Sequence, residues 1–292
     1  MNKHIQRKGI ILAGGTGSRL YPLTKAVSKQ LMPIFNKPMI YYALCILMMT
    51  GIKDILIIVN DKDLIPFKRL LGDGSNFGIT LNYAIQKKPE GIAQSFLIGK
   101  EFIKDNDVAL ILGDNLFHGN NIIEKLKNAN SQKSGATIFA YPVSNPENYG
   151  VIEFKDKKVF KIIEKPSIPP SKYAVTGLYF YDKTIVERAK NITPSQRGEL
   201  EITSINQSYI NDNSLNIEYL NRGTAWLDTG TFESLHEAGA YIRTLEKRQS
   251  LKIGCPEEIA WRQNWINDEK LKSLAEPLIK SGYGDYLLSL LG

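Results

Sequence analysis

A glycine-rich turn followed by cations is the first stretch of the chain that could carry out chemistry. Gly14, Gly15 and Gly17 follow the apolar run KGIILAG, which is typical of a buried strand. Glycines at such a turn let the backbone approach a ligand closely and direct its N–H groups toward it. Arg19 and Lys29 come next in the sequence. Backbone N–H groups and cations together predict an anionic ligand with phosphate chemistry.

Two aspartates occupy similar positions far apart in the chain. Asp114 ends the apolar run LILGD, and Asp228 lies in the aromatic and glycine-containing stretch GTAWLDTGT. Mg²⁺ in phosphate chemistry prefers one or two carboxylates, with substrate oxygens and water completing its coordination. A helix N-cap is the alternative role for Asp114. Each aspartate is therefore a candidate metal ligand.

Polar side chains that could recognise a base and a sugar follow other predicted strands. Gln86 lies at a strand end in YAIQKKPEG, and a carboxamide both donates and accepts, as thymine or uracil requires. Glu164 and Lys165 lie in KIIEKPS, where a carboxylate can bind neighbouring sugar hydroxyls and a lysine can bind a sugar phosphate. The alternatives are a surface glutamine and ordinary solvated hairpin charges.

The distribution of charge separates a local anion site from a nucleic-acid surface. The net charge is +7, and residues 1–53 contain eight Lys or Arg and no Asp or Glu. The remaining 239 residues carry 29 basic and 30 acidic side chains. A surface that binds duplex nucleic acid usually spreads its cations along a face. The excess at the glycine turn instead favours a polyphosphate site, and we expect no nucleic-acid partner.

Other features of the sequence indicate where in the cell the protein is located. No apolar run is long enough to span a bilayer, and the apolar run after the basic start is too short for a signal peptide. The chain has only two cysteines, Cys45 and Cys255. We therefore expect a cytoplasmic protein without a membrane partner.

The elements that must position these residues alternate between strands and helices. Strands are predicted at Gly9–Ala13, Ile55–Val59, Leu81–Ile85, Val108–Leu112 and Ala136–Tyr141. Helices are predicted at Ile40–Thr50, Leu64–Leu71, Ile92–Phe102 and Ile122–Asn130. This pattern predicts an α/β fold, with a Rossmann-like, mostly parallel sheet flanked by helices. Ligands of such sheets bind beyond the carboxyl ends of the strands.

The second half of the chain has a different pattern. It predicts a hairpin turning at 156–158, a mixed strand at Tyr173–Tyr181, a helix in ELEITSINQSYIND, a strand in NIEYL, and helices from Phe232 nearly to the end. We predict an α/β core over 1–245, which includes an inserted sugar-binding region over about 115–222. Residues 246–292 are predicted to form a helical C-terminal appendage with an interface or regulatory role.

The string G-G-x-G-x-R-L-x-P-L-T at 14–24, followed by Lys29 and by K-P-M at 37–39, resembles the signature of sugar-nucleotide pyrophosphorylases. Generic fingerprints do not fit, because the third glycine of a dinucleotide site and the Gly-Lys-Ser/Thr of a P-loop are absent. The spelling SKQLMPI is similar to the thymidylyl branch. The resemblance implies a fold of the nucleotide-diphospho-sugar transferase type, dTTP and glucose 1-phosphate as substrates, Mg²⁺ as cofactor and a homotetramer. It also implies a place in the supply of dTDP-sugars, commonly dTDP-rhamnose for surface polysaccharide. The alternatives are a uridylyltransferase that makes UDP-glucose and a non-catalytic nucleotide-sugar sensor.

The resemblance also assigns residues to roles. It implies nucleotide contacts at Leu12, Gly14, Gly15, Thr16, Gly17, Arg19, Lys29, Gln86, Pro89, Gly91 and Asp114. It implies sugar-phosphate contacts at Tyr149, Gly150, Glu164, Lys165, Val175 and Arg197. Asp114 and Asp228 become the metal pair, and the catalytic set is Arg19, Lys29, Asp114, Lys165 and Asp228.

The ending CPEEIAWRQNWI is similar to that of the short thymidylyl-transferring members of this family. Glu258 and Arg262 are four residues apart on a helix opened by Pro256, so they share one face. One interpretation is a surface ion pair on a packing helix. The other, which the resemblance favours, is a regulatory site at a subunit interface, formed with Ile259, that binds the end-product nucleotide sugar as a feedback inhibitor.

Overall fold

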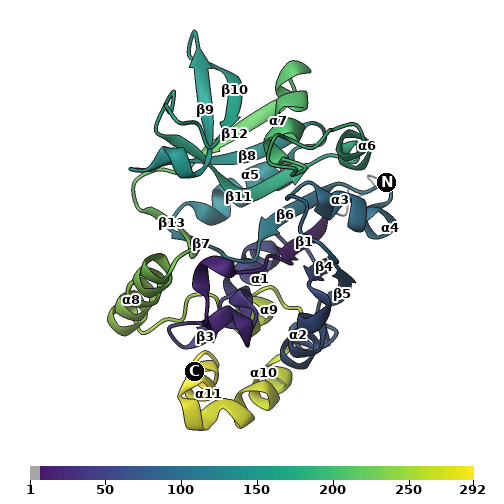
Figure 1. The fold of residues 1–292 in the computed structure, drawn as a ribbon. Helices are drawn as coiled ribbons and strands as arrows, with labels where there is room; N and C mark the ends of the chain where they lie inside the picture. Colours follow the sequence, from purple (N-terminus) through teal and green to yellow (C-terminus); the bar gives the residue numbers. More distant parts are fainter. Residues whose placement is uncertain (1–6) are drawn as a thin grey trace.

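The computed structural model describes residues 7–292 (Figure 1). The expectation that there is no signal peptide rests partly on the basic start of the chain. Residues 1–6 of that start lie outside the described residues. Among residues 7–292, no helix is both long enough and apolar enough to cross a membrane.

Four parallel strands form the part of the sheet that carries the predicted site. They run in the order β6 (Val108–Leu112), β1 (Lys8–Ala13), β4 (Asp54–Val59) and β5 (Thr80–Ile85). These strands are rich in Ile, Val and Leu because helices cover both faces. Their carboxyl ends meet at one edge, so the glycine turn after β1, Gln86 after β5 and Asp114 after β6 all lie at that edge.

The other half of the sheet is mixed. β11 (Tyr173–Tyr181) pairs antiparallel with β6 and joins β8 (Ala136–Pro142), which pairs parallel with β12 (Leu215–Tyr219). The hairpin of β9 (Gly150–Lys155) and β10 (Lys158–Glu164) extends this end, as Figure 1 shows. The predicted α/β fold is confirmed, and β11 is the strand through which antiparallel pairing enters the sheet.

Helices of the first 211 residues pack around this sheet. They are α1 (Ile40–Met49), α2 (Leu64–Leu71), α3 (Gln94–Ile98), α4 (Lys100–Ile103), α5 (Ile122–Ser131), α6 (Ile185–Lys190) and α7 (Ile202–Asn211). Short 3₁₀ turns lie at Ser18–Leu20, Leu23–Lys25, Lys29–Leu31, Asp61–Asp63, Ser75–Phe77, Pro146–Asn148 and Glu276–Ser281. The prediction of one helix over Ile92–Phe102 is wrong, because Gly99 separates α3 from α4. A Cβ atom at Gly99 would lie 3.2 Å from the side chains of Ile10 and Leu56, so the glycine allows close packing on the sheet.

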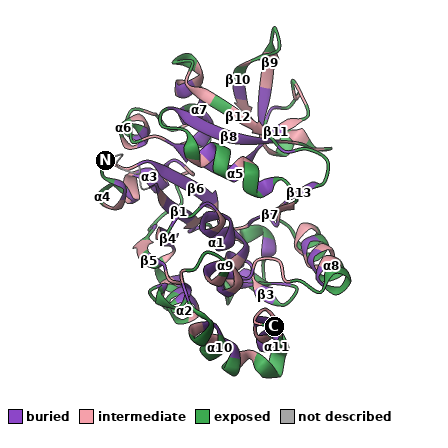
Figure 2. Cartoon of the chain, turned by 180° about the vertical axis from the view of Figure 1, so that it is seen from behind, coloured by how far each residue is buried: buried purple, intermediate pink, exposed green. Residues whose placement is uncertain are grey.

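Helix α1 is buried along almost its whole length (Figure 2). It lies between the sheet and the C-terminal helices α9 (Pro256–Arg262), α10 (Asp268–Ala275) and α11 (Tyr283–Ser289). Side chains of all three C-terminal helices are buried in the same apolar cluster as side chains of α1 and β1. The C-terminal segment therefore shares the main core, and the predicted boundary after residue 245 falls inside α8 (Phe232–Gln249).

Two short antiparallel pairs, to which no strands were assigned from the sequence, complete the fold. β7 (Asn115–Gly119) pairs with β13 (Thr224–Asp228), and β2 (Pro33–Ile34) pairs with β3 (Lys37–Pro38). Lys37 is buried, and its ammonium lies 2.6 Å from the carboxylate of Glu246. This ion pair attaches the β2–β3 hairpin to α8.

Candidate active site

The β7–β13 pair brings the two predicted metal ligands together. Asp228 is directly opposite Asn115 in this pair, and Asp114 is the residue before Asn115. The carbonyl oxygen of Asp114 accepts hydrogen bonds from the hydroxyl and the backbone N–H of Thr229, at 2.9 and 3.2 Å. Residues from two distant parts of the chain therefore meet beyond the carboxyl end of β6.

Cations balance these carboxylates unequally. The ammonium of Lys29 lies 2.5 Å from Asp114 Oδ2. Burial alone would raise the pKa of Asp114, but the charge and hydrogen bond of Lys29 hold it below its ordinary value. Burial and the neighbouring charge of Asp114 raise the pKa of Asp228 to about 6, against the opposing effect of Lys29 and Arg19. The site therefore concentrates negative charge that a further cation would stabilise.

The donor set fits a divalent cation that also binds substrate. Within residues 7–292, no group of three or more His, Cys, Asp or Glu side chains could form a complete protein cage for a metal. Asp114 and Asp228 alone would leave most coordination positions to phosphate oxygens and water. This is the arrangement that Mg²⁺ prefers in phosphate chemistry.

The glycine turn forms one wall of a cavity of about 200 Å³. Its lining residues are Gly15, Thr16, Gly17, Ser18, Arg19, Lys29, Gln30, Asp114 and Gly230. Gly17 has a positive φ of 64°, and its carbonyl accepts a hydrogen bond from Thr24 at 2.6 Å. Arg19 lies against Gly230, where a Cβ atom would be 2.9 Å from the guanidinium. Exposed backbone and two cations converge here, as an oligophosphate requires.

A second cavity, of about 230 Å³, shares Arg19 and Asp114 with the first. Its other lining residues are Ile92, Leu112, Asn115, Asn148, Tyr149, Gly150, Glu164, Lys165, Val175, Gly177, Tyr179, Ile202, Thr203, Trp226 and Asp228. Aromatic rings, hydroxyl and amide groups, and carboxylates make this cavity suitable for a sugar. Lys165 lines it close enough to Asp228 for its charge to lower the pKa of that carboxyl.

The local backbone and surroundings of Lys165 and Glu164 set the position and the pKa of the charged groups in this cavity. Lys165 has a positive φ of 42°, and its backbone N–H donates to Tyr149 O at 3.0 Å. A non-glycine residue in this conformation stores strain, which is typical of functional sites. Burial, followed by the charge of Glu201, raises the pKa of Glu164.

Gln86 lies behind the glycine turn. Its side chain is 2% exposed and donates to Gln94 Oε1 at 2.6 Å. A Cβ atom at Gly14 would be 2.1 Å from Gln86 Oε1, so the turn needs glycine at that position. Pro89 is exposed. Gly91, with a φ of 106°, packs against the backbone of Leu200.

Most of the residues that the resemblance assigns to the site lie around these two cavities. Leu12 is in β1, where its carbonyl accepts from Gly113 N at 2.9 Å. Arg197 does not line either cavity and instead lies within 3.0 to 3.6 Å of the carboxylates of Glu164, Glu199 and Glu201. Sequence reasoning missed Gln30, Asn115, Asn148, Tyr179 and Thr203. Gln30, Asn115 and Asn148 had a usable signal, since each is adjacent to a predicted site residue.

A larger cavity, of about 490 Å³, lies between α1, α5 and the start of α9. Glu258, Ile259 and Arg262 line it, together with Lys127 and Lys252. Arg262 donates to Glu258 Oε1 at 2.7 Å, so the ion pair expected from the spacing is formed on the cavity wall.

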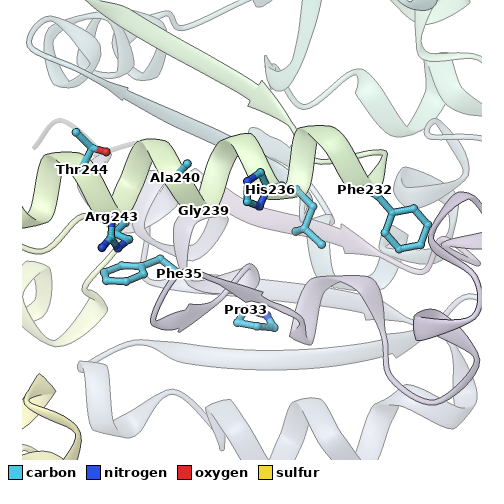
Figure 3. Close-up of a pocket in the computed structure, with 9 residues that line it drawn as sticks. Pro33, Phe35, Phe232, His236, Gly239, Ala240, Arg243 and Thr244 are labelled. Carbon is cyan, nitrogen blue, oxygen red and sulfur yellow. The ribbon is translucent and has the colours of Figure 1, made fainter.

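A groove of about 510 Å³ lies between the β2–β3 hairpin and α8. Figure 3 shows Phe35 and Pro33 facing His236 and Arg243 of α8. Among the described residues that line this groove there is no Asp or Glu, and none of them is predicted for the site. It therefore does not have the groups that phosphoryl chemistry with a metal requires.

Comparisons with known proteins agree with this geometry. The family described as nucleotidyl transferase matches residues 8–244. The chain is 56% identical to a glucose-1-phosphate thymidylyltransferase of Neisseria meningitidis over 97% of this chain and 99% of that protein. It is 55% identical to one of Mycolicibacterium smegmatis, with the same coverage. A Bacillus anthracis structure described as a putative glucose-1-phosphate thymidylyltransferase in complex with sucrose has a TM-score of 0.78 and 39% identity, covering 86% of this chain and 99% of that one.

Replacing Asp228 by Asn should stabilise the metal-free protein above pH 6. Because the pKa of Asp228 is raised on folding, the native state holds its proton more tightly, and stability falls as pH rises through the interval from about 4 to 6. A carboxamide at this position cannot ionise, so the variant should gain about 3 kcal/mol at pH 7.5 and nothing near pH 3.5. Denaturant unfolding in EDTA across this range measures the difference. A loss of stability in Asp228→Asn at pH 7.5 would contradict the assignment.

Proposed function

The chain belongs to the nucleotidyl transferase family, and on that basis we propose that it acts as a glucose-1-phosphate thymidylyltransferase. It transfers the thymidylyl group of dTTP to glucose 1-phosphate and releases pyrophosphate. The observation that carries this proposal is the pair of adjoining cavities that share Arg19 and Asp114. One cavity suits a triphosphate and the other suits a sugar phosphate, so the reacting phosphates would meet at Asp114 and Asp228.

Each residue has a role that follows from its position. Lys165 orients the sugar phosphate, which is already ionised and needs no general base to attack the α-phosphorus of dTTP. Arg19 and Lys29 stabilise the negative charge that develops on the departing pyrophosphate. Asp114 and Asp228 hold Mg²⁺, which when bound supplies positive charge to the phosphate oxygens. No covalent enzyme intermediate is required.

The alternatives differ in measurable ways. The names of relatives more than 50% identical favour dTTP over UTP, and the retained Asp114, Asp228, Arg19 and Lys165 argue against a non-catalytic sensor. The homotetramer, the cytoplasmic location and the place in dTDP-sugar supply stay predictions.

A pyrophosphate-release assay with each nucleoside triphosphate tests the function. Turnover should be highest with dTTP, weaker with UTP, and low with dCTP and the purine nucleotides. Cytosine has an amine and an unprotonated N3 where thymine has an acceptor and N3–H, so it would mispair with the Gln86 carboxamide. Values of kcat/KM that favour dCTP over UTP would contradict the role of Gln86. No release with any triphosphate would leave the sensor as the better interpretation.

Lys165→Ala and Arg19→Ala should damage different substrates. Loss of a charge-assisted contact to phosphate removes about 1.5–3 kcal/mol, or about ten- to a hundredfold in kcat/KM. The first variant should impair the use of glucose 1-phosphate, and the second should impair dTTP binding and pyrophosphate release. Steady-state kinetics with each substrate varied in turn measures both effects. Equal effects of both variants on both substrates would rule out this division of roles.

We also propose that the cavity lined by Glu258, Ile259 and Arg262 binds the end-product nucleotide sugar. Lys127, Lys252 and Arg262 supply cations for a diphosphate, and Glu258 supplies an acceptor for hydroxyls. Feedback inhibition requires that the ligand bind one state of the enzyme better than another. Arg262→Ala should therefore relieve inhibition by dTDP-rhamnose with little change in uninhibited turnover. Full sensitivity of the variant, or purely competitive inhibition against dTTP, would limit this segment to a packing role.

A further inference from the structure

Asn115 connects the metal-binding carboxylate with the wall of the sugar cavity. Its side chain is 3% exposed and lies at the start of β7, opposite Asp228 of β13. A buried amide has two N–H donors and one oxygen acceptor that need hydrogen-bond partners. The partners therefore indicate which groups the amide orients.

The partners of Asn115 fix which way the amide points. Its Oδ1 accepts from Trp226 Nε1 at 2.6 Å and from the backbone N–H of Gly177 at 3.1 Å. Both partners can only donate, so the atom facing them must be the oxygen. The Nδ2 group therefore faces the other way, and it donates to Asp114 Oδ1 at 3.0 Å.

The Asn115 side chain approaches β11 so closely that only glycine fits at the point of contact. A Cβ atom at Gly177 would lie 2.6 Å from Asn115 Oδ1. Glycine at 177 therefore makes the room in which the Asn115 amide is held. The orientation of the amide is set by three elements, β7, β11 and β13, rather than by its own rotamer preference.

The consequence is that both oxygens of Asp114 are held from different directions. Lys29 contacts Oδ2, and Asn115 contacts Oδ1. The two donors define the plane of the carboxylate before a ligand arrives. Groups that orient a metal ligand in this way reduce the ordering needed on binding.

The hydrogen bonds that run from Asp114 through Asn115 end at Trp226, which lies in the wall of the sugar cavity. Trp226 lines that cavity, and its ring packs against Tyr149 and Tyr141, with ring centroids 5.1 and 5.9 Å apart. The indole N–H is committed to Asn115. Two hydrogen bonds therefore connect the Trp226 ring with Asp114.

We infer that Asn115 is a positioning residue that orients the Asp114 carboxylate and couples its orientation to Trp226 in the sugar-cavity wall. This inference rests on the proposed function, since it takes Asp114 as a metal ligand. The competing account is that Asn115 only satisfies the N–H groups of Trp226 and Gly177. Asn115→Asp separates the two accounts, because it keeps the acceptor for both N–H groups and removes the donor to Asp114.

The test measures turnover in Asn115→Asp and Asn115→Leu, with thermal melting to establish that each is folded. Positioning predicts that kcat falls about ten- to a hundredfold in both variants, with the KM for dTTP and for glucose 1-phosphate little changed. Asn148→Asp is the matched control, since it adds the same charge to the sugar cavity from the 3₁₀ turn Pro146–Asn148, outside β7, β11 and β13. Asn115→Asp should lose much more kcat than this control. Native kcat in a folded Asn115→Asp would overturn the inference.

A spectroscopic readout is independent of turnover. The full-length chain is labelled with ¹⁵N-tryptophan, and the indole signal of Trp226 is identified by its absence in Trp226→Phe. Addition of Mg²⁺ alone should shift this signal in the wild type, and Asn115→Leu and Asp114→Asn should abolish the shift. An unchanged response in Asn115→Leu would overturn the coupling. If the wild type releases no pyrophosphate but the Mg²⁺-dependent shift is present, the proposed function fails and the positioning role stands.

Discussion

The proximity of two carboxylates at the end of β6 is the constraint on which the rest of the site depends. Like charges this close are unfavourable in a partly buried setting unless cations compensate them. Lys29 compensates Asp114 directly, whereas Asp228 keeps a raised pKa. The site is consequently short of positive charge until a metal ion binds. The glycine turn, Arg19 and Lys165 are arranged around this deficit.

The fold meets that constraint by bringing different parts of the chain to one edge. The parallel strands β1, β5 and β6 deliver the glycine turn, Gln86 and Asp114 to that edge. The β7–β13 pair then adds Asp228, and β11 lines the second cavity through Val175, Gly177 and Tyr179. Stability and function are linked here, since the hydrogen bonds of Asn115 and Thr229 both pack the β7–β13 pair and orient Asp114.

Sequence patterns predicted the elements whose apolar period is strong and missed those whose pairing is long-range. The strand Tyr173–Tyr181 and the helix Leu64–Leu71 agree with prediction because each is a continuous apolar or amphipathic segment. β7 and β13 are five residues each, and only their mutual pairing makes them strands. In the site, residues with charge or glycine signatures were predicted, whereas Tyr179 and Thr203 face the cavity only because of the tertiary fold. Arg197 was expected near phosphate and is instead surrounded by carboxylates.

The buried ion pair between Lys37 and Glu246 has a consequence for the order of events during synthesis. Its partners are 209 residues apart, so the hairpin that carries Lys37 leaves the ribosome long before Glu246 does. At about 5–20 residues per second, that interval is about 10–40 s. Throughout it the Lys37 ammonium must stay hydrated, because burying it unpaired is unfavourable. The hairpin therefore docks on α8 only after most of the chain has been made, and a nascent chain that stops before α8 lacks this contact.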